Sequence, residues 1–179
     1  MKVDGNRQTF KYNSNLWSNK ETFQPSNLDL DDKETKLASY WTLPFTELRL
    51  GMKIKGKTRW ITFSYTASSL YSLIADGQYK PTSIGESKWR SLLPRTSLQR
   101  NCKKEGFNAK SSHRNSVSKH SLARLGFIGN QEKNCQTPDS FLGFGTRYRS
   151  VRNSAGNYAT LLPDNGDVNI RAIGYIMAR

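Results

Sequence analysis

Residues 48–65 have the sequence LRLGMKIKGKTRWITFSY. Apolar side chains alternate at positions 48, 50, 52 and 54 and again at 61, 63 and 65, which is the period of a half-buried strand. Lys55-Gly56-Lys57 lies between the two runs and is typical of a turn. This stretch therefore predicts a β-hairpin at the centre of the fold.

Shorter signals flank the hairpin. Leu70, Leu73 and Ile74 follow the capping pair Ser68-Ser69 at helical spacing, and residues 86–93 repeat that spacing before Pro94. Residues 123–128 and 141–145 are apolar and contain glycine, which in strands marks close backbone approach. Residues 168–177 become apolar on both faces, which predicts an interior strand that holds the C-terminus in the sheet. The long basic stretch 95–121 has little apolar content and is expected to be a loop region.

These signals favour the α+β class: a single, irregular, β-centred domain with a few short helices and long loops. Residues 1–33 mix polar side chains with isolated aromatic ones and show no period. We expect them to form an N-terminal extension that is partly irregular.

Composition restricts the class of protein. The 179 residues carry 28 Lys and Arg against 14 Asp and Glu, a net charge of +14, and 11% are aromatic. Disordered chains lack aromatic residues, so a folded domain with a polar surface is expected. No apolar run approaches the length of a membrane span, and the N-terminal sequence MKVDGNRQTF lacks the apolar stretch of a secretory signal.

The basic charge is concentrated in residues 88–124, which contain ten Lys or Arg and one acid, Glu105. Such a local field attracts polyanions such as sulphated glycans, nucleic acids or anionic surfaces. The alternative is a solvated face that only keeps the protein soluble. The spacing matches no nucleic-acid recognition motif, so nucleic acid is the less favoured partner. The candidate polyanion- or glycan-binding residues are Arg95, Arg100, Lys103, Lys104, Lys110 and Arg114.

Cys102 and Cys135 are the only cysteines. A disulfide between them would close a ring of about 34 residues and stabilise the fold by roughly 3–4 kcal/mol. It would also indicate an oxidising, extracellular compartment; two unrelated buried thiols are the alternative. The spacing of these cysteines with His113 and His120 fits no compact zinc module. No phosphate-binding loop, nucleophile motif or dinucleotide fingerprint is present, so the sequence does not indicate an enzyme.

Seven ordered segments together resemble a known family. They are residues 34–41, 50–53, 69–77, 98–108, 123–128 leading to Cys135, 139–145, and 164–167 with 174–176. Their order resembles the C-terminal domain of secreted fibrinogen-like and intelectin-like proteins of marine invertebrates, which are related to the X-type lectins. The resemblance covers residues 34–179 and implies a fibrinogen-like recognition domain there.

The resemblance also implies a function. It points to an extracellular, non-enzymatic module that binds glycans or partner proteins, and to a calcium site for which Gln136 and Asp139 offer oxygen ligands. The chain departs from the family pattern at Arg49, Pro138 and near Gly156, where the family usually has further cysteines. We therefore expect a secreted, lectin-like carbohydrate-binding protein. The alternative is a polyanion-binding or matrix protein that acts through residues 88–124.

Overall fold

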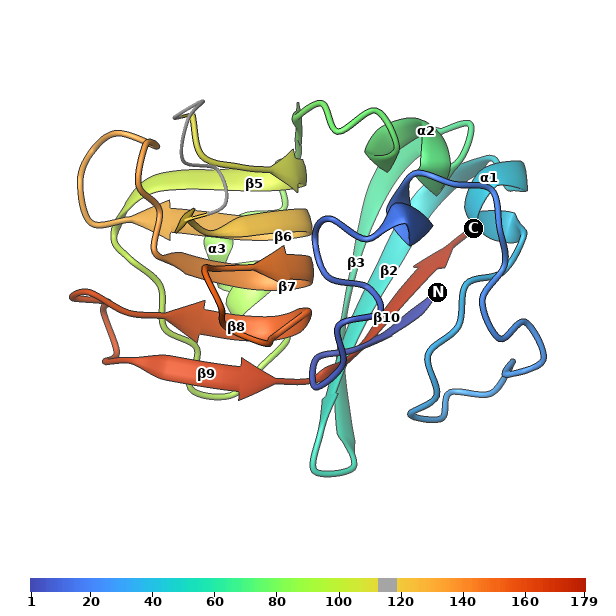
Figure 1. Ribbon diagram of the computed structural model, residues 1–179, viewed down its shortest axis with the longest axis horizontal. Coiled ribbons are helices and arrows are strands. Elements are labelled where there is room, and N and C mark those ends of the chain that lie inside the picture. Colours follow the sequence, from blue (N-terminus) through green and yellow to red (C-terminus); the bar gives the residue numbers. More distant parts are fainter. Residues whose placement is uncertain (113–118) are drawn as a thin grey trace.

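The computed structural model describes residues 1–112 and 119–179, which form two antiparallel β-sheets (Figure 1). Strands account for 42% of the chain and helices for 10%. The predicted α+β class is therefore wrong, because the fold is predominantly β. In Figure 1 the six-stranded sheet lies on the left and the four-stranded sheet on the right.

The four-stranded sheet has the order β1-β10-β2-β3. Its strands are β1 (Lys2–Asp4), β2 (Phe45–Ile54), β3 (Lys57–Ala67) and β10 (Ile173–Ala178). The predicted hairpin is confirmed as β2 and β3, in which Ile54 pairs with Lys57 across a two-residue turn. Lys55 and Gly56 both have positive φ, 47° and 77°, as a tight hairpin turn with the right twist requires. The interior strand predicted over residues 168–177 is confirmed only in its second half: β10 lies between β1 and β2, whereas residues 168–171 form a separate strand at the edge of the other sheet.

The six-stranded sheet has the order β4-β5-β6-β7-β8-β9. Its strands are β4 (Lys80–Pro81), β5 (Asn101–Ala109), β6 (Leu122–Asn130), β7 (Ser140–Arg147), β8 (Ala155–Ala159) and β9 (Val168–Arg171). Residues 95–121 were expected to form a loop region. This expectation is wrong for residues 101–109, which form β5. Its lysines conceal the strand pattern, since a strand can bear a charged side chain wherever that side chain reaches solvent.

The two sheets share one hydrophobic core. Leu48 and Leu50 of β2 belong to the same buried cluster as Leu125 of β6 and Phe144 of β7. The chain passes from one sheet to the other at Ala172, between β9 and β10. Burial of these side chains is the main stabilising contribution to a fold of this kind.

The helices are each about one turn long. They are α1 (Ser39–Thr42), α2 (Leu70–Ile74) and α3 (Glu86–Arg90), with a 3₁₀ turn η1 at Asn15–Trp17. The Ser69 hydroxyl accepts a hydrogen bond from the Ser72 amide, as a capping residue does. The helical spacing in the sequence therefore corresponds to helices, each of about one turn. The predicted segment 86–93 is helical only as far as Arg90.

Four glycines form a row across the six-stranded sheet. Gly106, Gly126, Gly143 and Gly156 are directly paired from β5 to β8. Gly156 has φ 142°, and a Cβ atom there would lie 2.0 Å from the Ile170 carbonyl oxygen. The row therefore allows neighbouring backbones to approach more closely than any larger residue would permit.

Residues 1–33 contribute to the same core. Val3, Phe10 and Trp17 are fully buried, and all three belong to the main hydrophobic cluster. The indole N–H of Trp17 donates to the carbonyl oxygens of Phe10 and Lys11. The core therefore continues across the boundary expected at residues 33 and 34.

Candidate anion-binding site

The structure separates the basic residues that the sequence places together. Lys103 and Lys104 are neighbours in β5, but they make contacts on different elements. Lys103 forms an ion pair of 2.5 Å with Glu86 of α3. Lys104 lies 4.2 Å from the centre of the Tyr79 ring. Arg95 and Arg100 are exposed, and Arg114 lies outside the described residues.

Lys104, Lys110 and Arg124 line one hollow of about 640 Å³. The other lining residues are Tyr12, Asp76, Gly77, Gln78, Ser111 and Ser112. Two of these cations were predicted as binding residues. Arg124 belongs to the basic stretch but was not singled out, and Tyr12 is 112 positions away from it in the sequence.

Lys104 is half-buried, and its position is fixed by two contacts. Its ammonium group donates to the Lys110 carbonyl oxygen at 3.2 Å and lies over the Tyr79 ring. Burial lowers the pKa of Lys104, and the positive charge of Lys110 lowers it further. A bound anion would offset this effect of one positive charge on the other.

Arg124 comes from β6 and reaches the hollow from another direction. Its Nε donates to the Tyr12 carbonyl oxygen at 2.6 Å, and one terminal nitrogen donates to Asn108 Oδ1 at 2.8 Å and to the Ile74 carbonyl oxygen at 3.4 Å. The guanidinium group stacks on the Tyr12 ring at 4.4 Å. Burial lowers the pKa of Arg124, although the group remains charged at any physiological pH.

The hollow carries uncompensated positive charge. Within residues 1–112 and 119–179, no carboxylate lies within 4.0 Å of the charged groups of Lys104, Lys110 or Arg124. The one carboxylate that lines the hollow, Asp76, forms an ion pair of 2.6 Å with Lys80. Partly buried charges of one sign attract a counter-ion more strongly than exposed ones do.

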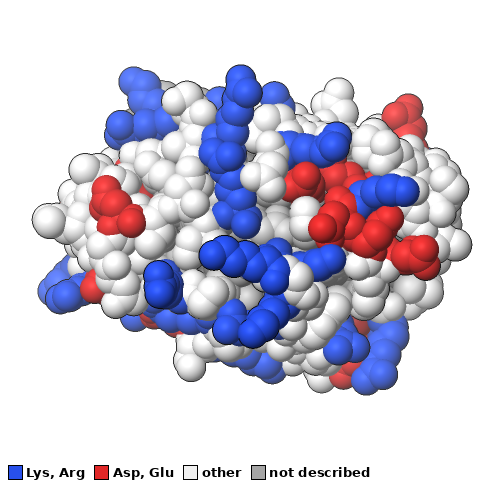
Figure 2. All heavy atoms as spheres, turned by 90° about the horizontal axis from the view of Figure 1, so that it is seen from below, with Lys and Arg blue, Asp and Glu red and all other residues white. Residues whose placement is uncertain are grey.

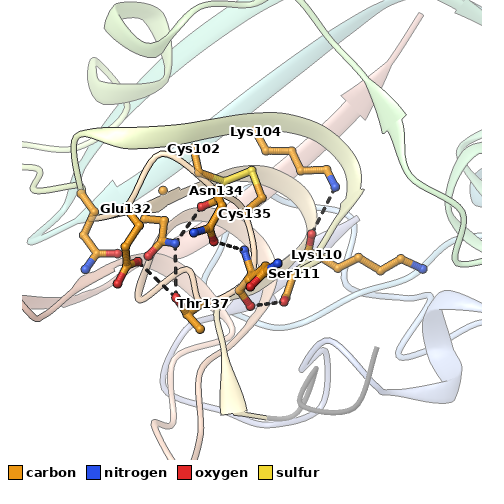
Figure 3. Close-up of a disulfide and its surroundings, with 12 residues drawn as sticks. Cys102, Lys104, Lys110, Ser111, Glu132, Asn134, Cys135 and Thr137 are labelled. Atoms are coloured by element: carbon orange, nitrogen blue, oxygen red, sulfur yellow. Dashed lines mark hydrogen bonds between the residues drawn. A yellow bond between two sulfur atoms is a disulfide. The ribbon is translucent and has the colours of Figure 1, made fainter. Parts of the chain in front are cut away.

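A disulfide supports one wall of the hollow (Figure 3). Cys102 and Cys135 are bonded with their Cα atoms 5.1 Å apart, which confirms the predicted pairing. The Cys135 carbonyl oxygen accepts a hydrogen bond of 2.8 Å from the Ser112 amide, and the neighbouring Gln136 carbonyl oxygen accepts one from the Ser111 hydroxyl. The disulfide thus holds the segment after Lys110 against the loop that follows β6.

The two residues expected to bind calcium have other surroundings. The carboxyl group of Asp139 is buried and lies 4.0 Å from His120 Nδ1, and burial raises its pKa. Gln136 is exposed. Calcium requires six to eight oxygen ligands, mostly carboxylates and carbonyls, whereas no group of three or more His, Cys, Asp or Glu that could hold a metal occurs in the described part of the chain.

Positive charge also extends beyond residues 88–124. The tip of the β2–β3 hairpin is the lowest part of Figure 1 and faces the viewer in Figure 2, where Lys and Arg side chains gather across the middle of the surface. Lys55, Lys57 and Arg59 at this tip are exposed. These three basic residues occupy every second position of the sequence, which is the pattern of one exposed face of a strand. This second basic surface was not identified from the sequence, because only the dense basic stretch at residues 88–124 was considered.

A scan against protein-family models found no match, and searches of curated proteins and of solved structures found none either. Within the described residues, the structure contains no helix that is long and apolar enough to cross a membrane. What the protein binds must therefore be inferred from the site.

Proposed function

We propose that this protein is an extracellular, non-enzymatic recognition module that binds acidic glycans. The observation that supports this function is the convergence of Lys104, Lys110 and Arg124 on one hollow without a carboxylate partner among the described residues. A hydroxyl-bearing wall of Tyr12, Ser111 and Ser112 completes the lining. Cations together with hydroxyl groups suit a ligand that carries both negative charge and alcohol groups.

The three cations are positioned in advance of binding. Each already donates to a backbone carbonyl oxygen: Lys104 to that of Lys110, Lys110 to that of Gly77 at 2.9 Å, and Arg124 to that of Tyr12. Side chains that are held in this way lose less conformational entropy when a ligand binds. They also retain further N–H donors for it.

The disulfide supports the extracellular and glycan parts of the proposal. Disulfides persist in oxidising compartments and are rare in the cytosol. The abundant polyanions outside cells are acidic glycans, whereas nucleic acids lie mainly inside. The cation set itself suits any polyanion, so nucleic acid is included as an arm of the test.

The test compares two neighbouring lysines of equal charge. Binding of fluorescent heparin fragments and of single-stranded DNA is titrated with the wild type, Lys104→Gln and Lys103→Gln. We expect Lys104→Gln to weaken heparin binding about tenfold, because a hydrogen bond to a charged group contributes about 1.5 kcal/mol. Lys103→Gln should change it less than about twofold, because Lys103 contacts Glu86 instead.

Other outcomes contradict the proposal. Equal weakening by both substitutions would show that heparin senses only the net charge. Tighter binding of DNA than of heparin at equal salt would assign the hollow to nucleic acid. Thermal unfolding of both variants checks that each remains folded.

A further inference from the structure

The N–H donors of Arg124 that make no hydrogen bond within the described protein determine which anion suits the hollow. A planar carboxylate is bound most strongly when two parallel N–H groups on one edge of a guanidinium group meet its two oxygens. One such edge contains Nε, which donates to the Tyr12 carbonyl oxygen. The other contains the terminal nitrogen that donates to Asn108 and Ile74. Both edges therefore lack one of the two donors that a carboxylate needs.

One terminal nitrogen of Arg124 keeps its donors for a ligand. Nη2 makes no hydrogen bond to any described residue, in contrast to Nε and Nη1. Among the described residues, the ammonium groups of Lys104 and Lys110 each make one hydrogen bond, to a backbone carbonyl oxygen. Since an ammonium group has three N–H donors, each keeps two. The hollow thus offers three separate groups of donors, from β5, from the residue that follows β5, and from β6.

We propose that the hollow binds a sulfate monoester and discriminates against a carboxylate, an inference that rests on the proposed recognition of acidic glycans. A sulfate ester presents three terminal oxygens that diverge from one sulfur atom, so that each can accept from a different cation. A carboxylate presents two oxygens in one plane and would leave one of the three cations without a direct contact. The sulfate ester is also fully ionised at every physiological pH.

The charge balance agrees with a tetrahedral monoanion close to the two lysines. Lys104 and Lys110 repel each other, and Lys110 lowers the pKa of Lys104. An ion that contacts both ammonium groups offsets this repulsion. The remaining volume of the hollow, of about 640 Å³ in all, and its hydroxyl-bearing wall leave room for the sugar that carries the sulfate.

The experiment uses two polymers with the same backbone. Dextran sulfate and carboxymethyl dextran are matched in length and in the number of charges per glucose, and binding to the wild-type protein is titrated at pH 7.5. We expect dextran sulfate to bind at least about fivefold more tightly, because the third cation contributes a direct contact only there. Lys110→Gln should reduce this preference to less than about twofold. Lys103→Gln, the control in β5 whose side chain pairs with Glu86 of α3, should retain it.

The outcomes separate this inference from the proposed function. Equal affinity for the two polymers would overturn the sulfate preference and leave acidic-glycan binding in place. Tighter binding of carboxymethyl dextran would also overturn it. Failure to bind either polymer, together with failure to bind heparin, would overturn the proposed function itself. A preference that survives in Lys110→Gln would place the sulfate site elsewhere on the protein.

Discussion

Lys103 and Lys104 are adjacent in the sequence, but their side chains have different surroundings. Lys103 pairs with Glu86, while Lys104 rests on the Tyr79 ring and contributes to the hollow. Successive side chains of a strand point to opposite faces, so equal residues next to each other meet different surroundings. Charge counts along the sequence cannot reveal this, because the counts ignore the face on which each residue lies.

Lys36 is a second cation whose surroundings decide its behaviour. It is fully buried, and its ammonium group donates to the carbonyl and side-chain oxygens of Asn19 at 2.8 and 2.6 Å. It also lies 4.8 Å from the centre of the Tyr40 ring. Burial lowers the pKa of Lys36 to about 8. Protonation therefore costs free energy in the folded state.

This shift predicts a pH-dependent stability. Between pH 8 and 10 the unfolded chain binds a proton at Lys36 that the folded chain has begun to release, so stability should rise with pH. We expect the free energy of unfolding of the wild type to increase by about 1–2 kcal/mol from pH 7.5 to 9.5, relative to Lys36→Met. Urea titrations at the two pH values measure this difference. Parallel behaviour of the two proteins would refute the assignment.

At the scale of elements, the glycine row leaves no room for a side chain at one level of four neighbouring strands. Each glycine of the row is paired with a glycine on the next strand, from Gly106 in β5 to Gly156 in β8. The sequence indicated glycine-containing strands at 123–128 and 141–145. Their mutual register could not be predicted, because pairing partners such as Gly126 and Gly143 are set by contacts distant in the chain.

Replacing one member of the row should therefore be costly. In Gly156→Ala the new methyl group would meet the Ile170 carbonyl oxygen at 2.0 Å, and φ there is 142°. We expect a loss of about 3 kcal/mol or more, since steric conflict adds to the backbone penalty. Gly77→Ala is the matched control: φ is 66° and no atom lies within 4 Å, so only about 1 kcal/mol should be lost. Thermal and urea unfolding measure both, and equal losses would contradict the role of the row.

The sequence predicted the elements whose side chains alternate clearly. The hairpin at residues 48–65 has apolar residues at the strand period and was confirmed. The strand predicted at 168–177 was confirmed only over its second half, because the chain changes sheet at Ala172 and forms two strands there. The strand β5 was missed because Lys103, Lys104 and Glu105 interrupt the apolar pattern. The short helix predicted after Ser69 was confirmed as α2, whereas the one predicted over residues 86–93 ends at Arg90.

At the scale of the whole molecule, the hollow depends on distant segments that the fold brings together. Tyr12 comes from the N-terminal region, Lys104 and Lys110 from β5 and its end, and Arg124 from β6. A search of the sequence finds the lysines, since they are close together in a basic stretch. It cannot find Tyr12, whose contact with Arg124 exists only after both sheets have assembled.

The disulfide should contribute to the stability of the whole fold. Replacing Cys102 and Cys135 with Ser should lower the free energy of unfolding by about 3–4 kcal/mol, from the loop entropy that the bond removes from the unfolded chain. Urea unfolding measures the change, and the wild type under reducing conditions should match the variant. An unchanged unfolding midpoint would show that the bond is dispensable for stability.

The same bond has a consequence for covalent topology. Residues 102–135 form a closed ring that contains all of β6 and nearly all of β5. A single protease cut between Lys110 and Arg124 would open the backbone but leave its two parts in one molecule. The three cations would then still belong to one covalent particle, and the nick would become visible as two fragments only after reduction.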